Sequence, residues 1–161
     1  MFDTNEKGRP MTDRETESWI SLIIAGVMIW ILQDRMLDGW TLTPHDAGDL
    51  LTLYLWLIAV TIVAEIVLAI GAAILRGGRD AVADERDRLI QRRASLVEYY
   101  FFVVAINAVI LVILGNAAYA DVFVPRVDLL TAAALFFALM LMLYFGNVVK
   151  QLTAIALYRL G

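Results

Sequence analysis

The chain has 161 residues, of which 61% are hydrophobic and 19% are charged, and its formal net charge is −4. Soluble domains contain about 45–50% apolar residues, so this composition leaves too little polar surface for a water-facing globule. There is no cysteine and a single histidine, His45, which excludes disulfides, cysteine-ligated zinc, iron–sulfur clusters and a bis-histidine haem site. We therefore predict an integral membrane protein with no cofactor or metal of its own and no direct nucleic-acid binding.

The first 17 residues are rich in charge, contain Gly8 and Pro10, and show no apolar period. This pattern is typical of a solvated, largely unstructured tail. It lacks the basic start, short apolar stretch and small-residue cleavage site of a signal peptide. We expect a flexible tail over residues 1–17 and a transmembrane bundle over residues 18–161.

Four apolar segments follow, at about residues 19–37, 50–75, 96–115 and 127–149. Each meets or approaches the ~20 residues that a helix needs to cross the hydrocarbon core of a bilayer. Helices are required because lipid offers no partner for the backbone groups of an open strand. The predicted fold class is all-α: a polytopic membrane protein with four transmembrane helices.

The distribution of Lys and Arg predicts the orientation. Eleven of these residues lie in the N-terminal tail, the connection between the second and third segments, and the C-terminal stretch, whereas only Arg35 and Arg126 lie on the other side. Because basic residues are retained on the cytoplasmic side, both termini should face the cytoplasm.

The connection between the first two segments should begin with a turn at Asp38-Gly39-Trp40. Thr43 followed by Pro44 is typical of a helix start, with Thr43 as the N-cap. Several acidic residues and one imidazole lie nearby, but their spacing matches no metal site, and a helix N-terminus favours acidic residues in any case. The residues of this group are Asp34, Asp38, His45, Asp46 and Asp49.

The stretch DAVADERDRLIQRRASLVEYY, residues 80–100, continues the third segment toward the cytoplasm. We expect a helical extension around residues 80–95, with an apolar stripe formed by Val82, Leu89 and Val97. Its charged residues either hold the helix at the right depth or form a docking face for a partner. The candidate partner-binding residues are Asp84, Glu85, Arg86, Arg88, Arg92 and Arg93.

Asp84-Glu85-Arg86, followed by Ile90, Ala94 and Tyr99-Tyr100 at the entry to a membrane helix, resembles the central motif of uncharacterised families of small, multispanning prokaryotic membrane proteins. The resemblance covers residues 84–100 and implies a four-helix protein of the prokaryotic cytoplasmic (inner) membrane. Some such proteins are thought to work beside a small DNA-binding regulator. The resemblance implies no catalytic residues.

Polar residues within the spans are the other candidates. Glu65 should lie about 16 Å from Arg76, near mid-membrane, where a carboxyl is expected to point into the bundle as a proton or cation relay, a ligand contact or a structural hydrogen bond. Asn107 and Asn147 are expected to form hydrogen bonds between helices. A contact between Glu98 and Lys150 is possible. Residues 148–160 form either the end of the fourth helix or an interfacial amphipathic helix.

These features favour a non-catalytic accessory or regulatory membrane protein, not an enzyme, that acts through a membrane or cytoplasmic partner or as a homo-oligomer. The alternative is a small oligomeric transporter or proton- or ion-conducting protein that uses Glu65.

Overall fold

The computed structural model describes residues 13–39, 41–75, 85–118 and 129–160. It contains four long helices, α1 (Asp13–Met36), α2 (Ala47–Leu75), α3 (Glu85–Ala118) and α4 (Ala132–Leu160). A short antiparallel hairpin of β1 (Leu37–Asp38) and β2 (Thr41–Leu42) connects α1 to α2. All four helices are long and apolar enough to cross a membrane, which confirms the predicted four-span, all-α fold.

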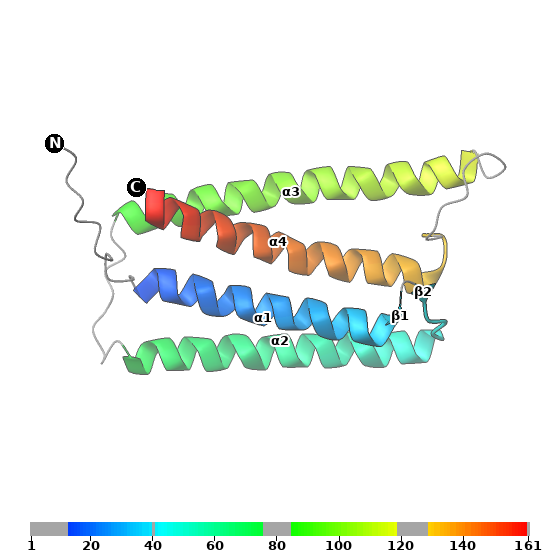
Figure 1. Cartoon of the computed structure of the whole chain (residues 1–161), viewed down its shortest axis with the longest axis horizontal. Coiled ribbons are helices and arrows are strands. Elements are labelled where there is room, and N and C mark those ends of the chain that lie inside the picture. The colour runs from blue at the N-terminus through cyan, green and yellow to red at the C-terminus, as the bar shows by residue number, and fades with distance from the viewer. Residues whose placement is uncertain (1–12, 40, 76–84, 119–128, 161) are drawn as a thin grey trace.

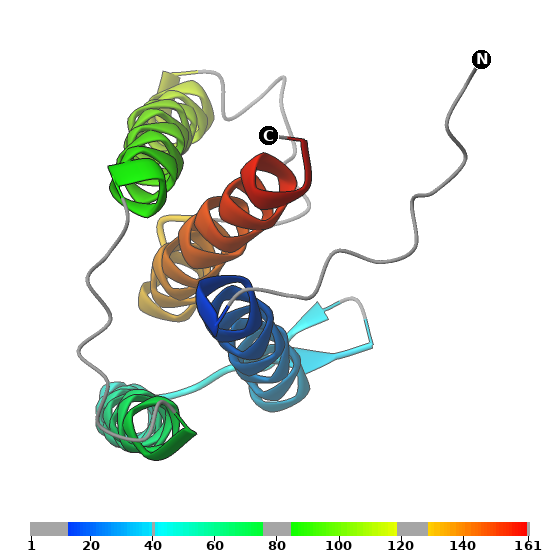
Figure 2. The same cartoon turned by 90° about the vertical axis from the view of Figure 1, so that its left-hand side faces the viewer.

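The helices lie in a curved row in the order α3, α4, α1, α2 (Figures 1 and 2). Helix α4 packs against both α1 and α3, whereas α2 makes its main contacts with α1 alone. The consecutive helices α2 and α3 therefore lie at opposite ends of the row.

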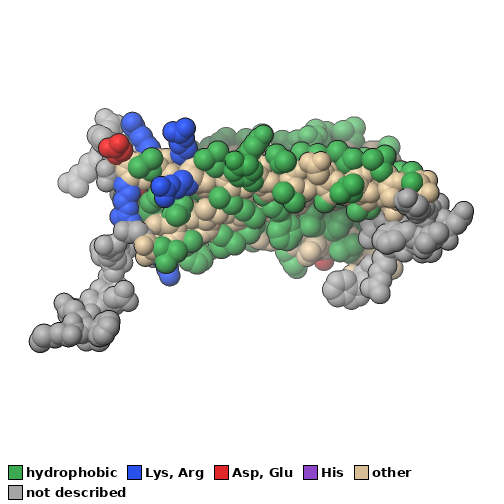
Figure 3. Space-filling view, turned by 90° about the horizontal axis from the view of Figure 1, so that it is seen from above, with side chains coloured by type: hydrophobic (Ala, Val, Ile, Leu, Met, Phe, Trp, Pro, Cys, Tyr) green, Lys and Arg blue, Asp and Glu red, His purple; other side chains and the backbone are tan. Residues whose placement is uncertain are grey.

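Two ends of the bundle can be distinguished by charge. Lys and Arg side chains gather at one end, opposite the β1–β2 hairpin (Figure 3). We call the first the basic end and the second the hairpin end. The described arginines at the basic end are Arg14, Arg86, Arg88, Arg92, Arg93 and Arg159.

The main core lies between α1, α4 and α2. Met28, Leu32 and Met36, spaced three or four residues apart on one face of α1, are at most 2% exposed. Tyr144 of α4 and the α2 residues Leu50 and Leu57 complete this cluster. Few other α2 residues are buried, so this helix leaves most of its apolar surface to lipid.

Helices α3 and α4 are antiparallel and contact each other at every fourth residue, along a line that we call the seam. Ile90 and Ala94 pack with Ala154 and Tyr158, and one turn further along, Glu98 forms an ion pair with Lys150 at 3.1 Å. The Phe102 ring then covers Gly146. The predicted stripe does not lie on this seam, because Leu89 and Val97 are 50% and 40% exposed. Val82 lies outside the described residues.

The expected tail is wrong over its last residues, because α1 begins at Asp13 rather than after residue 17. Glu15 is only 7% exposed and accepts a hydrogen bond from Arg159 of α4 at 3.0 Å. Arg159 also lies over the ring of Trp19, 5.7 Å from its centroid. These two contacts of Arg159 hold the start of α1 against the end of α4. They explain why the helix includes a charged segment that has no apolar pattern. Residues 1–12 lie outside the described part of the chain.

The N-cap of α2 is Asp46 rather than Thr43. The Asp46 carboxylate accepts a hydrogen bond from the backbone N–H of Asp49 at 2.8 Å. Thr43 instead satisfies the end of α1, because both its backbone N–H and its hydroxyl donate to the Met36 carbonyl at 3.0 Å. Gly39 makes the hairpin turn with a φ of 63°.

Helix α4 begins at Ala132, later than predicted, with Thr131 as its N-cap: the Thr131 hydroxyl accepts from the Ala134 N–H at 3.2 Å. It then continues without a break to Leu160. Of the two alternatives for residues 148–160, the structure therefore favours the helix extension over a separate interfacial helix.

Candidate functional site

The basic extension of α3 exposes most of its predicted partner-binding residues. Ile90 and Ala94 face α4, so Arg88 and Arg92, two residues to either side of Ile90, lie on the far side of a helix with about 3.6 residues per turn. Both are exposed, as is Arg93, and none of the three forms a hydrogen bond or ion pair with a described residue. We call Arg88, Arg92 and Arg93 the arginine face.

The other predicted residues of this segment differ in their surroundings. Glu85 is exposed at the start of α3. Arg86 is exposed too, but its guanidinium donates to the Tyr158 carbonyl near the end of α4 at 3.5 Å. That bond caps the α4 C-terminus and joins α3 to it. Asp84 lies outside the described residues.

A second candidate is a polar pocket of about 230 Å³ at the basic end. All four helices contribute to it, and the α2 contribution includes Glu65. Within the described part of the chain the Glu65 carboxylate forms no hydrogen bond or ion pair, and the residue is exposed. The lining residues are Arg14, Glu17, Ser18, Ser21, Glu65, Leu68, Gln91 and Gln151.

The two predicted asparagines lie apart. Asn147 belongs to a polar chain beside this pocket: Gln151 donates to the Asn147 side-chain oxygen at 3.1 Å and to the Ser21 hydroxyl of α1 at 3.3 Å. Asn107 is exposed, and its amide donates to the Val103 carbonyl of the same helix at 2.7 Å. Among the described residues, neither asparagine forms the expected hydrogen bond to another helix, because the Asn147 oxygen accepts from Gln151 of its own helix and a carbonyl four residues earlier satisfies the Asn107 amide.

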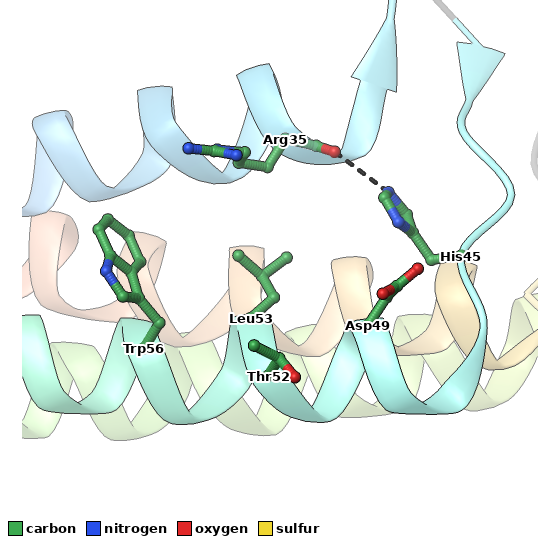
Figure 4. A pocket seen from close by; sticks show the side chains of 6 residues that line it. All are labelled: Arg35, His45, Asp49, Thr52, Leu53 and Trp56. Atoms are coloured by element: carbon green, nitrogen blue, oxygen red, sulfur yellow. Dashed lines mark hydrogen bonds between the residues drawn. The ribbon is translucent and has the colours of Figure 1, made fainter.

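A larger pocket, of about 410 Å³, lies at the hairpin end and was not predicted from the sequence. Arg35 closes one side from α1, and Asp49, Thr52, Leu53 and Trp56 line the other from a single face of α2 (Figure 4). Their spacing of three and four residues was a visible signal, but nothing in the sequence placed Arg35 opposite them.

His45 completes this pocket and is held in place by two contacts. Its Nε2 lies 2.9 Å from the Thr43 hydroxyl oxygen and 3.1 Å from the Arg35 carbonyl oxygen. Because the Thr43 hydroxyl donates to Met36, a protonated Nε2 donates to both oxygens, which ties the imidazole to the end of α1. Among the described residues no group of three or more His, Asp or Glu side chains is arranged to hold a metal ion.

Comparisons with protein-family models, curated proteins and solved structures find no match to this chain. The resemblance over residues 84–100 thus stays a prediction.

Proposed function

We propose that this chain is a non-catalytic accessory or regulatory protein of the membrane that acts through a protein partner bound at the arginine face. The observation that carries the proposal is that Arg88, Arg92 and Arg93 are exposed and have no partner among the described residues. By contrast, Lys150 and Arg159 at the same end form ion pairs with neighbouring helices.

The chemistry of this face indicates what it would bind. A guanidinium presents several donors in a planar fork that matches a carboxylate in two-point contact. Leu89 is 50% exposed beside these arginines and adds apolar surface. An acidic protein segment with an apolar anchor fits this combination.

The proposal places both termini and the basic end in the cytoplasm of a prokaryotic cell, because basic residues stay on that side. Thr16 and Thr41 are exposed at opposite ends of the bundle, and the chain has no native cysteine. Single cysteines at these positions should react differently with an impermeant maleimide in intact cells: Thr41→Cys should label and Thr16→Cys should not. The reverse pattern would overturn the orientation.

Site-specific photo-crosslinking tests the partner. A photoreactive residue at position 89 should give a discrete cross-linked product in cells. Arg88→Glu with Arg92→Glu should abolish this product, whereas Arg88→Lys with Arg92→Lys should retain it. Melting temperatures should agree within a few degrees, because exposed charges contribute only ~0–1 kcal/mol. A product that survives charge reversal would contradict the proposal.

A second candidate function is proton or ion conduction through Glu65. The observation in its favour is that Glu65 lines a polar pocket to which all four helices contribute. In liposomes, Glu65→Gln should then abolish proton or ion flux, and Asp34→Asn, which changes an exposed carboxylate of α1, should not. Equal flux for wild type and Glu65→Gln would contradict conduction through Glu65.

A further inference from the structure

The hairpin-end pocket lies at the ends of two helices that are long and apolar enough to cross a membrane, and we infer that the boundary between hydrocarbon and headgroups lies at this level. The α1 span ends at Met36 and the α2 span begins at Ala47. Arg35 and Asp49 are therefore within a turn of the ends of two transmembrane helices. A pocket at this level is accessible to lipid molecules from the side and to water from above.

The lining residues change in polarity along the membrane normal. At 1.5 Å per residue, Asp49 lies about 6 Å further out than Leu53 and about 10 Å further out than Trp56. Figure 4 shows the Arg35 side chain running along α1 over the pocket, with its guanidinium on the side of Trp56, while His45 and Asp49 lie together on the outer side. From inside outward the pocket therefore presents the Trp56 ring, then the Arg35 guanidinium, then Leu53, and finally the Asp49 carboxylate (Figure 4).

The two charges of this pocket are not paired with each other. Neither the Arg35 guanidinium nor the Asp49 carboxylate forms an ion pair or side-chain hydrogen bond with any described residue. Both are exposed in the isolated chain. Opposite charges that face one pocket and stay apart are complementary to a ligand that carries both signs.

A phospholipid with an amine in its headgroup has this order of groups: acyl chains, then phosphate, then ammonium. We propose that the hairpin-end pocket binds the headgroup of such a lipid, with its phosphate at Arg35 and its ammonium at Asp49. The acyl chains then lie further along the same face of α2, where Val63 and Val67, about two and three helical turns beyond Trp56, are 59% and 63% exposed. The contacts of His45 with Thr43 and with the end of α1 fix the outer side of the pocket in the absence of lipid.

The ammonium is a primary amine rather than a trimethylated one. A carboxylate binds a primary ammonium through N–H donors, which a quaternary ammonium lacks. Quaternary groups are recognised by Trp, Tyr and Phe side chains, but Trp56, the one such residue among the described residues that line the pocket, lies on the side away from Asp49. Phosphatidylethanolamine is therefore preferred over phosphatidylcholine, and an anionic lipid such as phosphatidylglycerol lacks a group for Asp49.

Native mass spectrometry of the full-length protein with defined lipids tests this inference. Wild type should retain phosphatidylethanolamine about tenfold better than phosphatidylcholine, with a stepwise loss through the mono- and dimethylated lipids, because a hydrogen bond between charged groups contributes about 1.5 kcal/mol or more. This series needs no variant. Equal retention of all the lipids would overturn the proposal.

Variants then assign the two charges. Asp49→Asn should remove the preference for phosphatidylethanolamine over phosphatidylglycerol, and Arg35→Gln should weaken retention of both lipids. Asp34→Asn, the same change at an exposed carboxylate that does not line the pocket, should behave as wild type. Identical effects of the two Asp variants would contradict the assignment, as would displacement of bound lipid by an equal concentration of free O-phosphoethanolamine.

Discussion

At Gly146 the Phe102 ring of α3 packs directly against the backbone of α4. A Cβ added there would lie 2.9 Å and 3.0 Å from Cε1 and Cε2 of the Phe102 ring, inside ordinary van der Waals contact. Gly146→Ala therefore forces the ring to turn or the two helices to separate. Separation would also disturb the Glu98–Lys150 ion pair one turn away along the seam.

The expected magnitude follows from two opposing effects. Overpacking of a close contact costs about 1–3 kcal/mol. Alanine in a helix interior gains about 0.5–1 kcal/mol over glycine because it loses less backbone entropy. We therefore expect Gly146→Ala to lower the free energy of unfolding by about 1 kcal/mol.

A double-mutant cycle isolates the clash. Phe102→Ala removes the ring, so adding Gly146→Ala in that background should be neutral or stabilising. Gly26→Ala is the matched control, because a Cβ at this α1 position meets nothing within 4 Å and should stabilise the protein slightly. Unfolding free energies are measured by denaturant titration in mixed micelles.

Equal effects of Gly146→Ala and Gly26→Ala on the free energy of unfolding would contradict the proposed clash. An equal destabilisation by Gly146→Ala with and without the Phe102 ring would also contradict it, since the cost would then not arise from their contact.

Three further substitutions test individual contacts in the same titration. Asp46→Ala removes the N-cap of α2 and should cost about 1 kcal/mol, whereas Asp46→Asn should cost much less. Glu15→Gln weakens the bond to the half-exposed Arg159 and should cost about 1 kcal/mol, less at high salt; an effect independent of salt would contradict a charge contribution. Asn107→Leu should leave stability unchanged or raised, because its amide bonds only to its own helix; a loss above about 1 kcal/mol would indicate an interhelical partner.

The four spans were predictable from the sequence because they depend on local properties. An apolar run of sufficient length must form a helix in lipid whatever its neighbours are. The continuation of α3 outward from its apolar segment was predictable for a similar reason, since acidic residues precede arginines at helical spacing. The local pattern also placed Glu65 alone among apolar residues.

The position of each helix in the row was decided only by the tertiary structure. Helices α2 and α3 are apolar on all sides in their spans, so their patterns do not indicate which face packs. The small residues Ala94 and Gly146 on the α3–α4 seam could not be distinguished from the other alanines and glycines of the chain.

The same limit applies to the two pockets and to the caps. Thr43 has the residue type of an N-cap, but its hydroxyl donates to the Met36 carbonyl at the end of α1, and Asp46 caps α2 instead. Arg35 and Asp49 line one pocket only because the hairpin turns the chain back at Gly39. Sequence determines which segments can cross the membrane, since transfer into lipid depends on each segment alone. Pairing of side chains from different helices depends on how those helices pack, and the sequence of a single segment does not indicate this packing.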